Sequence, residues 1–172
     1  NPSPKALVRK AAQIVALMSA CSCAREGPID IDVSGQPEWV VDAIEDAAEF
    51  WSLHDIEVNL VDGPGPDVIT VEVAPASNID GNNAQWFPLD GKVKIADRYA
   101  DDEDSLPASC AFAHEIGHVI GMQHVEAGRS LMTAPLSRSR DGCWWSADDQ
   151  LELCRATGCT NTTSKTSNET ER

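Results

Sequence analysis

Three of the four histidines in this chain lie in one short segment, HEIGHVIGMQH at positions 114–124. A helix over residues 106–120 would place His114 and His118 one turn apart on the same face, where both imidazoles can bind one metal ion. Glu115 would project beside this pair, where its carboxylate can reach a water molecule on the metal. The spacing therefore predicts two metal ligands and a general base on one helix.

The third histidine of the segment requires a change of chain direction. In a continuous helix, His124 would lie roughly 9 Å beyond His118 along the axis. Gly121 allows the chain to turn back, because glycine can adopt a positive φ and end a helix. Three neutral nitrogens would then bind one tetrahedral Zn²⁺ and leave its fourth position for water, as in catalytic zinc sites.

Two other interpretations of this segment are weaker. Histidines can lie on a helix surface without a metal, but the fixed residues of HExxHxxGxxH should occur together by chance less than about once in a million positions. The second alternative is a zinc-containing surface protein that binds peptides without cleaving them. It leaves Glu115 unexplained, because only the chemistry requires a carboxylate there.

Hydrophobic periodicity indicates the elements that must position this helix. Residues 28–34 alternate apolar and polar side chains, as in a half-buried strand. Pro37 precedes an amphipathic segment whose apolar residues recur at helical spacing up to Trp51. We expect this helix to pack on a sheet. Its further strands are predicted at residues 56–61, 67–74 and 92–97, the last reached through a loop at residues 77–91.

Length and charge restrict the class of protein. The chain has 172 residues, 42% of them apolar, which is enough for one domain with a substantial core. Its formal net charge of −15 would repel nucleic acid and anionic membranes, so neither is expected as a partner. Ca²⁺ remains an open alternative at the acidic run 101–104 and at DGNN, residues 80–83. A helix N-terminus that favours carboxylates and a simple turn explain these segments without a metal.

Cysteine content and the N-terminal segment indicate export. Six cysteines in a chain of this size favour an oxidising setting. Basic residues precede a largely apolar run that ends at Cys21, as in a secretory signal. The sequence MSAC at residues 18–21 resembles a bacterial lipobox, in which case Cys21 would carry a lipid anchor to the membrane. A plain cleaved signal and a helix of the folded domain are the alternatives, so we expect a secreted, periplasmic or membrane-anchored bacterial protein.

HEIGHVIGMQH matches every fixed position of the long zinc signature of the metzincin metalloproteases, and the chain resembles that clan. Metzincins have a methionine turn beneath the metal, and SLMTAP at residues 130–135 resembles that turn. The short spacing from His124 to Met132 is similar to that of the matrixins, the branch related to the matrix metalloproteases. The order of the predicted elements extends the resemblance over residues 28–158.

The resemblance implies an α+β, metzincin-like fold. It would contain a twisted mixed β-sheet, a long packing helix and an active-site helix, followed by a small C-terminal subdomain with the methionine turn and a final helix. Ser146 can cap that final helix. By the resemblance, Asp148 and Asp149 at its start would brace the methionine turn. We expect an export segment at residues 1–23, the peptidase domain at residues 24–159 and a polar, disordered tail at residues 160–172.

The implied activity is that of a zinc endopeptidase, expected to be a monomer, that hydrolyses peptide bonds of proteins or peptides outside the cytoplasm. Glu115 would take a proton from the attacking water and pass it to the leaving amine. Some metzincins have a tyrosine ligand two residues after the turn methionine, but that position here is Ala134, which favours a site with three histidines. The substrate would extend along an edge strand, for which residues 92–97 are the candidate. Lys92 and Lys94 could equally serve only to protect that edge from aggregation.

The resemblance also bears on the cysteines and the substrate pocket. Cys110 lies where matrixins line the primed-side pocket, and Cys143 lies in the segment that forms its far wall. A Cys110–Cys143 bridge would join them, with Cys154 paired to Cys159, although free thiols remain an alternative. Pro135 lies one residue later than in the matrixin pattern, which leaves the shape of this pocket open.

Overall fold

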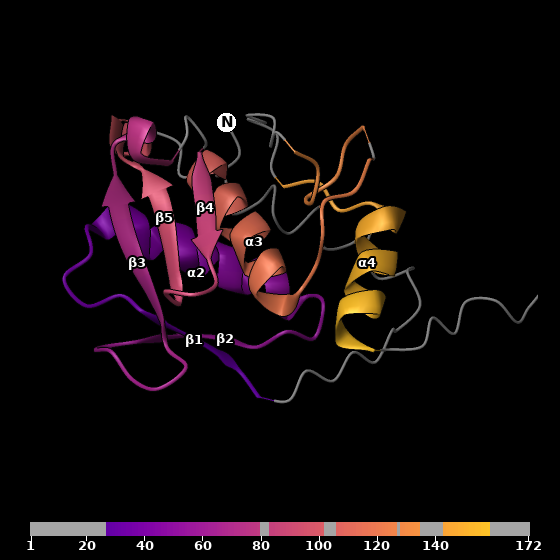
Figure 1. The fold of residues 1–172 in the computed structure, drawn as a ribbon, viewed down its shortest axis with the longest axis horizontal. Coiled ribbons are helices and arrows are strands. Elements are labelled where there is room, and N and C mark those ends of the chain that lie inside the picture. Colours follow the sequence, from indigo (N-terminus) through magenta and orange to yellow (C-terminus); the bar gives the residue numbers. More distant parts are fainter. Residues whose placement is uncertain (1–26, 80–82, 102–105, 127, 135–142, 159–172) are drawn as a thin grey trace, which may run out of the picture.

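The computed structural model describes residues 27–79, 83–101, 106–126, 128–134 and 143–158. These residues form one sheet, two long helices against one of its faces and a further helix beyond them (Figure 1). The α+β fold class expected from the sequence is confirmed. The export segment with Cys21, the tail, Pro135, Cys159 and most of both acidic segments lie outside the described residues.

The sheet has five strands in the order β2-β1-β3-β5-β4. All neighbours are parallel except β4, which runs antiparallel to β5. Parallel strands require crossover connections, and helix α2 provides the one from β1 to β2. The strands are β1 (Ile29–Asp32), β2 (Val58–Val61), β3 (Ile69–Ala74), β4 (Ala84–Phe87) and β5 (Lys92–Ala96).

Two predictions about the sheet are wrong. Strand β5 is not an edge strand, because it pairs with β3 on one side and β4 on the other. Lys92 and Lys94 therefore do not protect an edge, and both instead form ion pairs with Glu72 of β3. The edge strand on this side of the sheet is β4, which lies inside the segment predicted to be a loop. Asp90 and Gly91 in the turn between β4 and β5 are a hairpin signal that could have indicated this strand.

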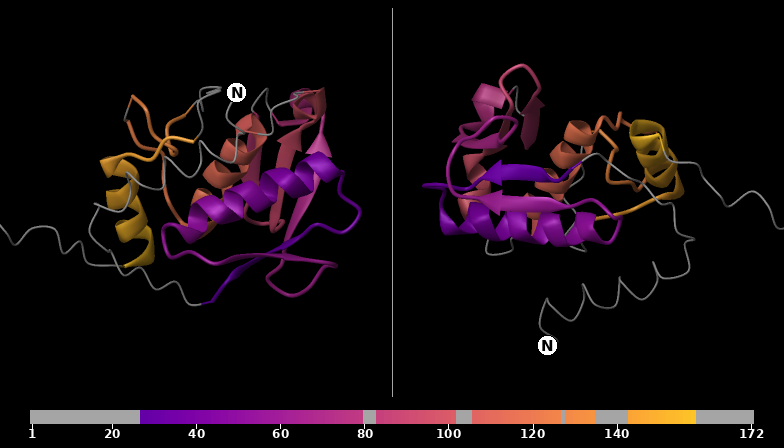
Figure 2. Two further views of the ribbon diagram at one scale, coloured as in Figure 1. Left: turned by 180° about the vertical axis from the view of Figure 1, so that it is seen from behind. Right: turned by 90° about the horizontal axis from the view of Figure 1, so that it is seen from below.

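Helix α2 (Glu38–Ser52) follows Pro37, as predicted. Its buried face reaches Trp51, which is fully buried. The indole Nε1 of Trp51 donates a hydrogen bond to the carbonyl of Ala113, 3.0 Å away. Helix α2 therefore holds the neighbouring helix by packing and by a directed hydrogen bond, and both helices lie on the same side of the sheet (Figure 2).

Helix α3 (Leu106–Ile120) carries the histidine motif and lies between α2 and α4 (Ala147–Thr157). Ser146 caps α4, with its hydroxyl accepting a hydrogen bond from the Asp149 N–H. No helix in the described ranges is long and apolar enough to cross a membrane.

One disulfide joins Cys110 of α3 to Cys143, three residues before the cap of α4. This confirms one predicted pair. The second predicted pair is wrong, because Cys154 is a free, buried thiol. Its proposed partner Cys159 lies outside the described residues.

Candidate metal centre

The structure brings the three histidines of the motif together. The Nε2 atom of His118 lies 3.1 Å from Nε2 of His114 and 3.1 Å from Nε2 of His124. The remaining side of the triangle, between His114 and His124, is 3.2 Å. Within the described part of the chain, this is the one group of three or more potential ligands close enough to hold a metal ion.

The triangle fits a tetrahedral zinc ion. With Zn–N bonds of about 2.0–2.1 Å, tetrahedral angles place ligand nitrogens about 3.3 Å apart. The three observed separations are within about 0.2 Å of that value, which is the tolerance expected for such a site. The donor set of three imidazoles is also typical of zinc and leaves one position for water or substrate.

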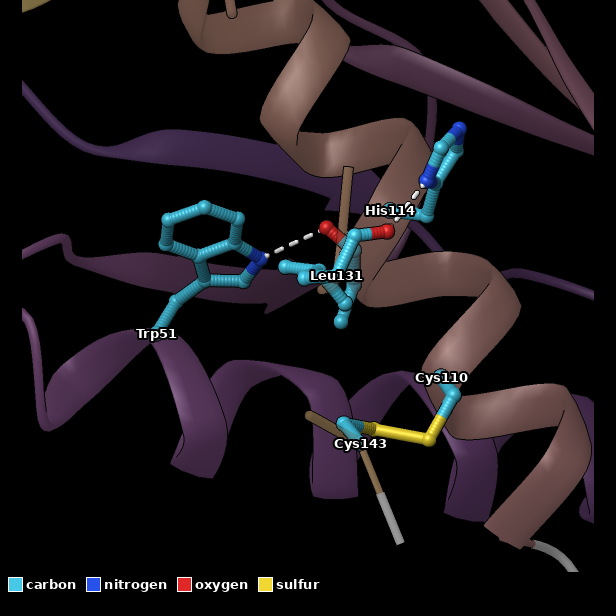
Figure 3. The surroundings of a disulfide bond; sticks show 6 residues. Trp51, Cys110, His114, Leu131 and Cys143 are labelled. Atoms are coloured by element: carbon cyan, nitrogen blue, oxygen red, sulfur yellow. Dashed lines mark hydrogen bonds between the residues drawn. A yellow bond between two sulfur atoms is a disulfide. The ribbon is translucent and has the colours of Figure 1, made fainter. Parts of the chain in front are cut away.

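Backbone carbonyls fix the proton on two of the rings. Nδ1 of His114 lies 2.6 Å from the carbonyl oxygen of Leu131 (Figure 3), and Nδ1 of His118 lies 2.9 Å from that of Met122. A carbonyl only accepts, so each Nδ1 carries the proton and each Nε2 presents a lone pair toward the centre. Burial lowers the pKa of His114 to about 4 and also lowers the pKa of His118. Both rings are therefore held neutral, which is the form that binds a metal.

Gly121 produces the turn that the third ligand requires. Its φ is +99°, and α3 ends at the residue before it. The N–H groups of Gly121 and Met122 bond to the last carbonyls of the helix, those of His118 and Gly117. The chain then doubles back, so that His124 reaches the face of α3 that carries the other two ligands.

Glu115 follows His114 on α3, and 5% of its surface is exposed. Burial raises the pKa of its carboxyl group to about 7, an effect opposed by a hydrogen bond from the backbone N–H of Trp86. That bond is 2.7 Å long and comes from strand β4. The side chain is thus oriented by the edge of the sheet, and its proton affinity is close to that of a base working at neutral pH.

Met132 packs against α3 at Gly117 and is fully buried. Gly117 faces it so closely that a Cβ at position 117 would come 2.5 Å from the Met132 sulfur. Met132 also accepts a hydrogen bond at its carbonyl from the N–H of Val125, next to His124. The methionine turn is therefore in contact with the segments that carry all three ligands.

Asp149 holds the methionine turn. It is fully buried, and its carboxylate accepts hydrogen bonds from the Ser130 hydroxyl, the N–H groups of Leu131 and Met132, and both the N–H and hydroxyl of Ser146. Asp148 is exposed in the first turn of α4 and makes none of these contacts. The expectation that both aspartates brace the turn therefore applies to Asp149 alone.

The fourth histidine lies apart from this centre. His54 follows α2, is 9% exposed, and stacks on Trp145 with ring centroids 3.9 Å apart. Burial lowers its pKa to about 4. Among the described residues, His54 belongs to no group of three or more potential metal ligands.

Several contributions to the site were missed by the sequence analysis. Leu131, Met122 and Trp86 contribute backbone atoms, and the residue type does not reveal which backbone groups are used. Gly117 lies at a variable position of the motif, and only its small size signals close packing. The hairpin signal near β4 was the one available indication that Trp86 lies on a strand.

Comparison with known proteins gives a family assignment. The matrixin peptidase family model matches residues 29–153. Stromelysin-3 of Homo sapiens is 32% identical over 108 residues, which cover 59% of this chain and 20% of that protein. The chain therefore spans about a fifth of the length of this relative.

Two solved structures also resemble the chain, each with a TM-score of 0.49. A zinc-dependent peptidase from Methanocorpusculum labreanum is 14% identical, with 73% of this chain and 98% of that chain covered. An archaemetzincin from Methanopyrus kandleri is 12% identical, with 77% and 97% covered.

Proposed function

Because the chain belongs to the matrixin family of zinc-dependent peptidases, we propose that it is an exported endopeptidase that hydrolyses peptide bonds with Glu115 as general base. His114, His118 and His124 would hold one Zn²⁺. The observation that carries the proposal is the triangle of Nε2 atoms, together with the buried carboxylate of Glu115, the residue after His114 on α3. A protein that only stores zinc would have no use for that carboxylate.

The groups of the site would have different roles in peptide hydrolysis. Zinc, when bound, supplies a Lewis acid that polarises a carbonyl and acidifies water. Glu115 accepts the proton of the attacking water and donates it to the leaving amine. The N–H of Trp86 holds the Glu115 carboxylate in one orientation. With a pKa near 7, Glu115 can both take up and release a proton near neutral pH.

A peptide substrate would extend along β4. This strand is the edge of the sheet next to the metal centre, as the contact between Trp86 and Glu115 demonstrates. Main-chain hydrogen bonds to an edge strand bind an extended peptide with little dependence on its sequence. We therefore propose β4 in place of the strand suggested by the sequence, with side-chain preference determined by other contacts.

Export is supported by the Cys110–Cys143 disulfide, because such bonds persist in oxidising compartments. Recovery of the native protein from the cytoplasm with both thiols reduced would contradict this part of the proposal.

Metal removal and restoration test the activity. The full chain is assayed with a mixed peptide library before dialysis against a chelator, after it, and after addition of one equivalent of Zn²⁺. We expect cleavage to disappear on chelation and to return with zinc, with one zinc bound per chain. A zinc-loaded protein that binds peptides but leaves them uncut would favour the binding protein instead, and cleavage unaffected by chelation would contradict zinc dependence.

A further inference from the structure

The three candidate ligands differ in whether a hydrogen bond at Nδ1 orients the imidazole ring. His114 and His118 are each oriented by a hydrogen bond from Nδ1 to a backbone carbonyl. Over the residues that the structure describes, Nδ1 of His124 has no such partner, and this side chain is exposed. The position of its Nε2 atom therefore depends on how firmly its backbone is held.

That backbone is held from both sides. We define the His124 segment as residues 121–125. On one side, the N–H of Val125 donates to the carbonyl of Met132, 3.0 Å away. On the other side, the N–H of Gln123 donates to the Glu152 carboxylate at 2.5 Å, and Arg155 donates from Nη2 to the carbonyl of Gly121 at 2.8 Å.

Glu152 and Arg155 form one unit on α4. Their side chains are joined by two hydrogen bonds, from Nε and Nη2 of Arg155 at 2.8 and 2.7 Å. The carboxylate meets an N–H and the guanidinium meets a carbonyl, so each charged group faces the backbone group of complementary polarity. A single ion pair between residues three apart on a helix, here with the Arg155 side chain 55% exposed, contributes little to helix stability by itself. An ion pair that only stabilised α4 would not need the contacts that Glu152 and Arg155 make to the His124 segment.

We propose that Glu152 and Arg155 are positioning residues of the metal centre, which fix His124 by clamping the backbone of the His124 segment to α4. The inference rests on the proposed zinc site and adds residues outside the histidine motif. Loss of groups that support metal ligands typically weakens metal affinity about 10- to 100-fold. We expect a loss of this size when either side chain is removed.

Zinc affinity measured on the full chain tests this proposal. Glu152→Ala and Arg155→Ala are compared with Leu151→Ala, which alters a neighbouring, half-exposed residue of the same helix. Zinc dissociation constants come from competition with a chromogenic chelator, and the visible spectrum of the Co²⁺-loaded protein reports the ligand geometry. We expect weaker binding and an altered Co²⁺ spectrum in the two clamp variants, with the Leu151 variant unchanged.

Exchanging the charges of Glu152 and Arg155 distinguishes two explanations of a loss in zinc affinity, which are loss of the contacts to the His124 segment and general destabilisation of α4. The double variant Glu152→Arg with Arg155→Glu restores the ion pair but places a donor against the Gln123 N–H and an acceptor against the Gly121 carbonyl. It should bind zinc as weakly as the alanine variants although it keeps an ion pair on α4, whereas Glu152→Gln, which keeps an acceptor, should bind zinc more tightly than Glu152→Ala. Recovery of full zinc affinity in the exchanged variant would overturn the proposal, as would wild-type affinity in both alanine variants. Failure of the unaltered chain to bind zinc would instead refute the proposed function.

Discussion

At the scale of single residues, backbone groups determine which ring nitrogen of two ligands carries the proton and how the Glu115 carboxylate is oriented. The carbonyls of Leu131 and Met122 fix the tautomers of two ligands, and the N–H of Trp86 orients Glu115. Side-chain types alone would permit several arrangements of these protons. The backbone contacts select the one in which two Nε2 lone pairs converge, and they hold the carboxylate of Glu115 against strand β4.

Gly117 provides a residue-scale prediction. On an isolated helix, Gly→Ala would stabilise by about 1 kcal/mol. In this chain the added Cβ would come 2.5 Å from the Met132 sulfur, and Met132 is fully buried. We therefore expect Gly117→Ala to lower the free energy of unfolding by about 1 to 3 kcal/mol, as for overpacked cores, in denaturant titrations of the zinc-free protein.

The control for this prediction is the same change in a Met132→Ala background. Because that background removes the sulfur, Gly117→Ala should no longer destabilise and should approach the stabilisation expected for a helix. An equal cost in both backgrounds would show that the contact with Met132 is not the cause.

The convergence of three histidines could be predicted from the sequence, but the backbone groups that support the site could not. His114, Glu115, His118 and His124 follow from residue type, helical spacing and the turn at Gly121. Backbone atoms of distant segments have no such signature, since every residue offers the same N–H and carbonyl groups. Only the folded arrangement of α3, β4 and the methionine turn reveals which ones are used.

At the scale of elements, α4 holds the metal centre through its N-terminal turn. Asp149 links the cap residue Ser146 to three groups of the methionine turn, so helix capping and the placement of Met132 use the same carboxylate. Its neighbour Asp148 is exposed. The two adjacent aspartates therefore form a matched pair of positions for mutation.

We expect Asp149→Asn to lower the free energy of unfolding by about 2 to 4 kcal/mol, because the amide NH₂ would face buried donors and charge-assisted hydrogen bonds would be lost. Asp148→Asn should change it by no more than about 0.5 kcal/mol, as for ordinary surface substitutions. Chemical denaturation of both variants measures this difference. Equal effects at the two positions would contradict the role assigned to Asp149.

Elements with clear periodicity were predicted correctly, and strand β4 was not. Helix α2 shows its buried face over the whole of residues 38–52, and α3 is identified by its motif. Strand β4 has the sequence AQWF, which does not alternate clearly, whereas the equally short β1 and β2 lie in the alternating segments 29–33 and 56–60. Missing β4 left β5 as the last strand, which is why the wrong edge was assigned to the substrate.

At the scale of the whole molecule, His54 joins α2 to the segment before α4 by stacking on Trp145. Burial lowers its pKa from 6.5 to about 4. Between these values the unfolded chain binds a proton that the folded chain does not, so stability is lost as the pH falls from 6.5 to 4. At about 1.4 kcal/mol per pKa unit, the loss from this residue amounts to roughly 3 kcal/mol.

His54→Gln should remove this contribution. The free energy of unfolding of the zinc-free protein is measured between pH 7.5 and 4.5 for the unaltered chain and the variant. Since His114 and Glu115 titrate in both proteins, the difference between the two curves isolates His54. We expect the variant to lose less stability on acidification, and parallel curves would rule out a buried, neutral His54.

We propose that Glu115 is the base of a zinc peptidase whose metal is held independently by three histidines. The most direct measurement combines zinc content and peptide cleavage rate for the unaltered chain and Glu115→Gln. The variant should retain one zinc per chain and lose about 10²- to 10⁴-fold in cleavage rate, the range that proton transfer by a positioned side chain contributes. A zinc-loaded variant that cleaves at the unaltered rate would contradict the account.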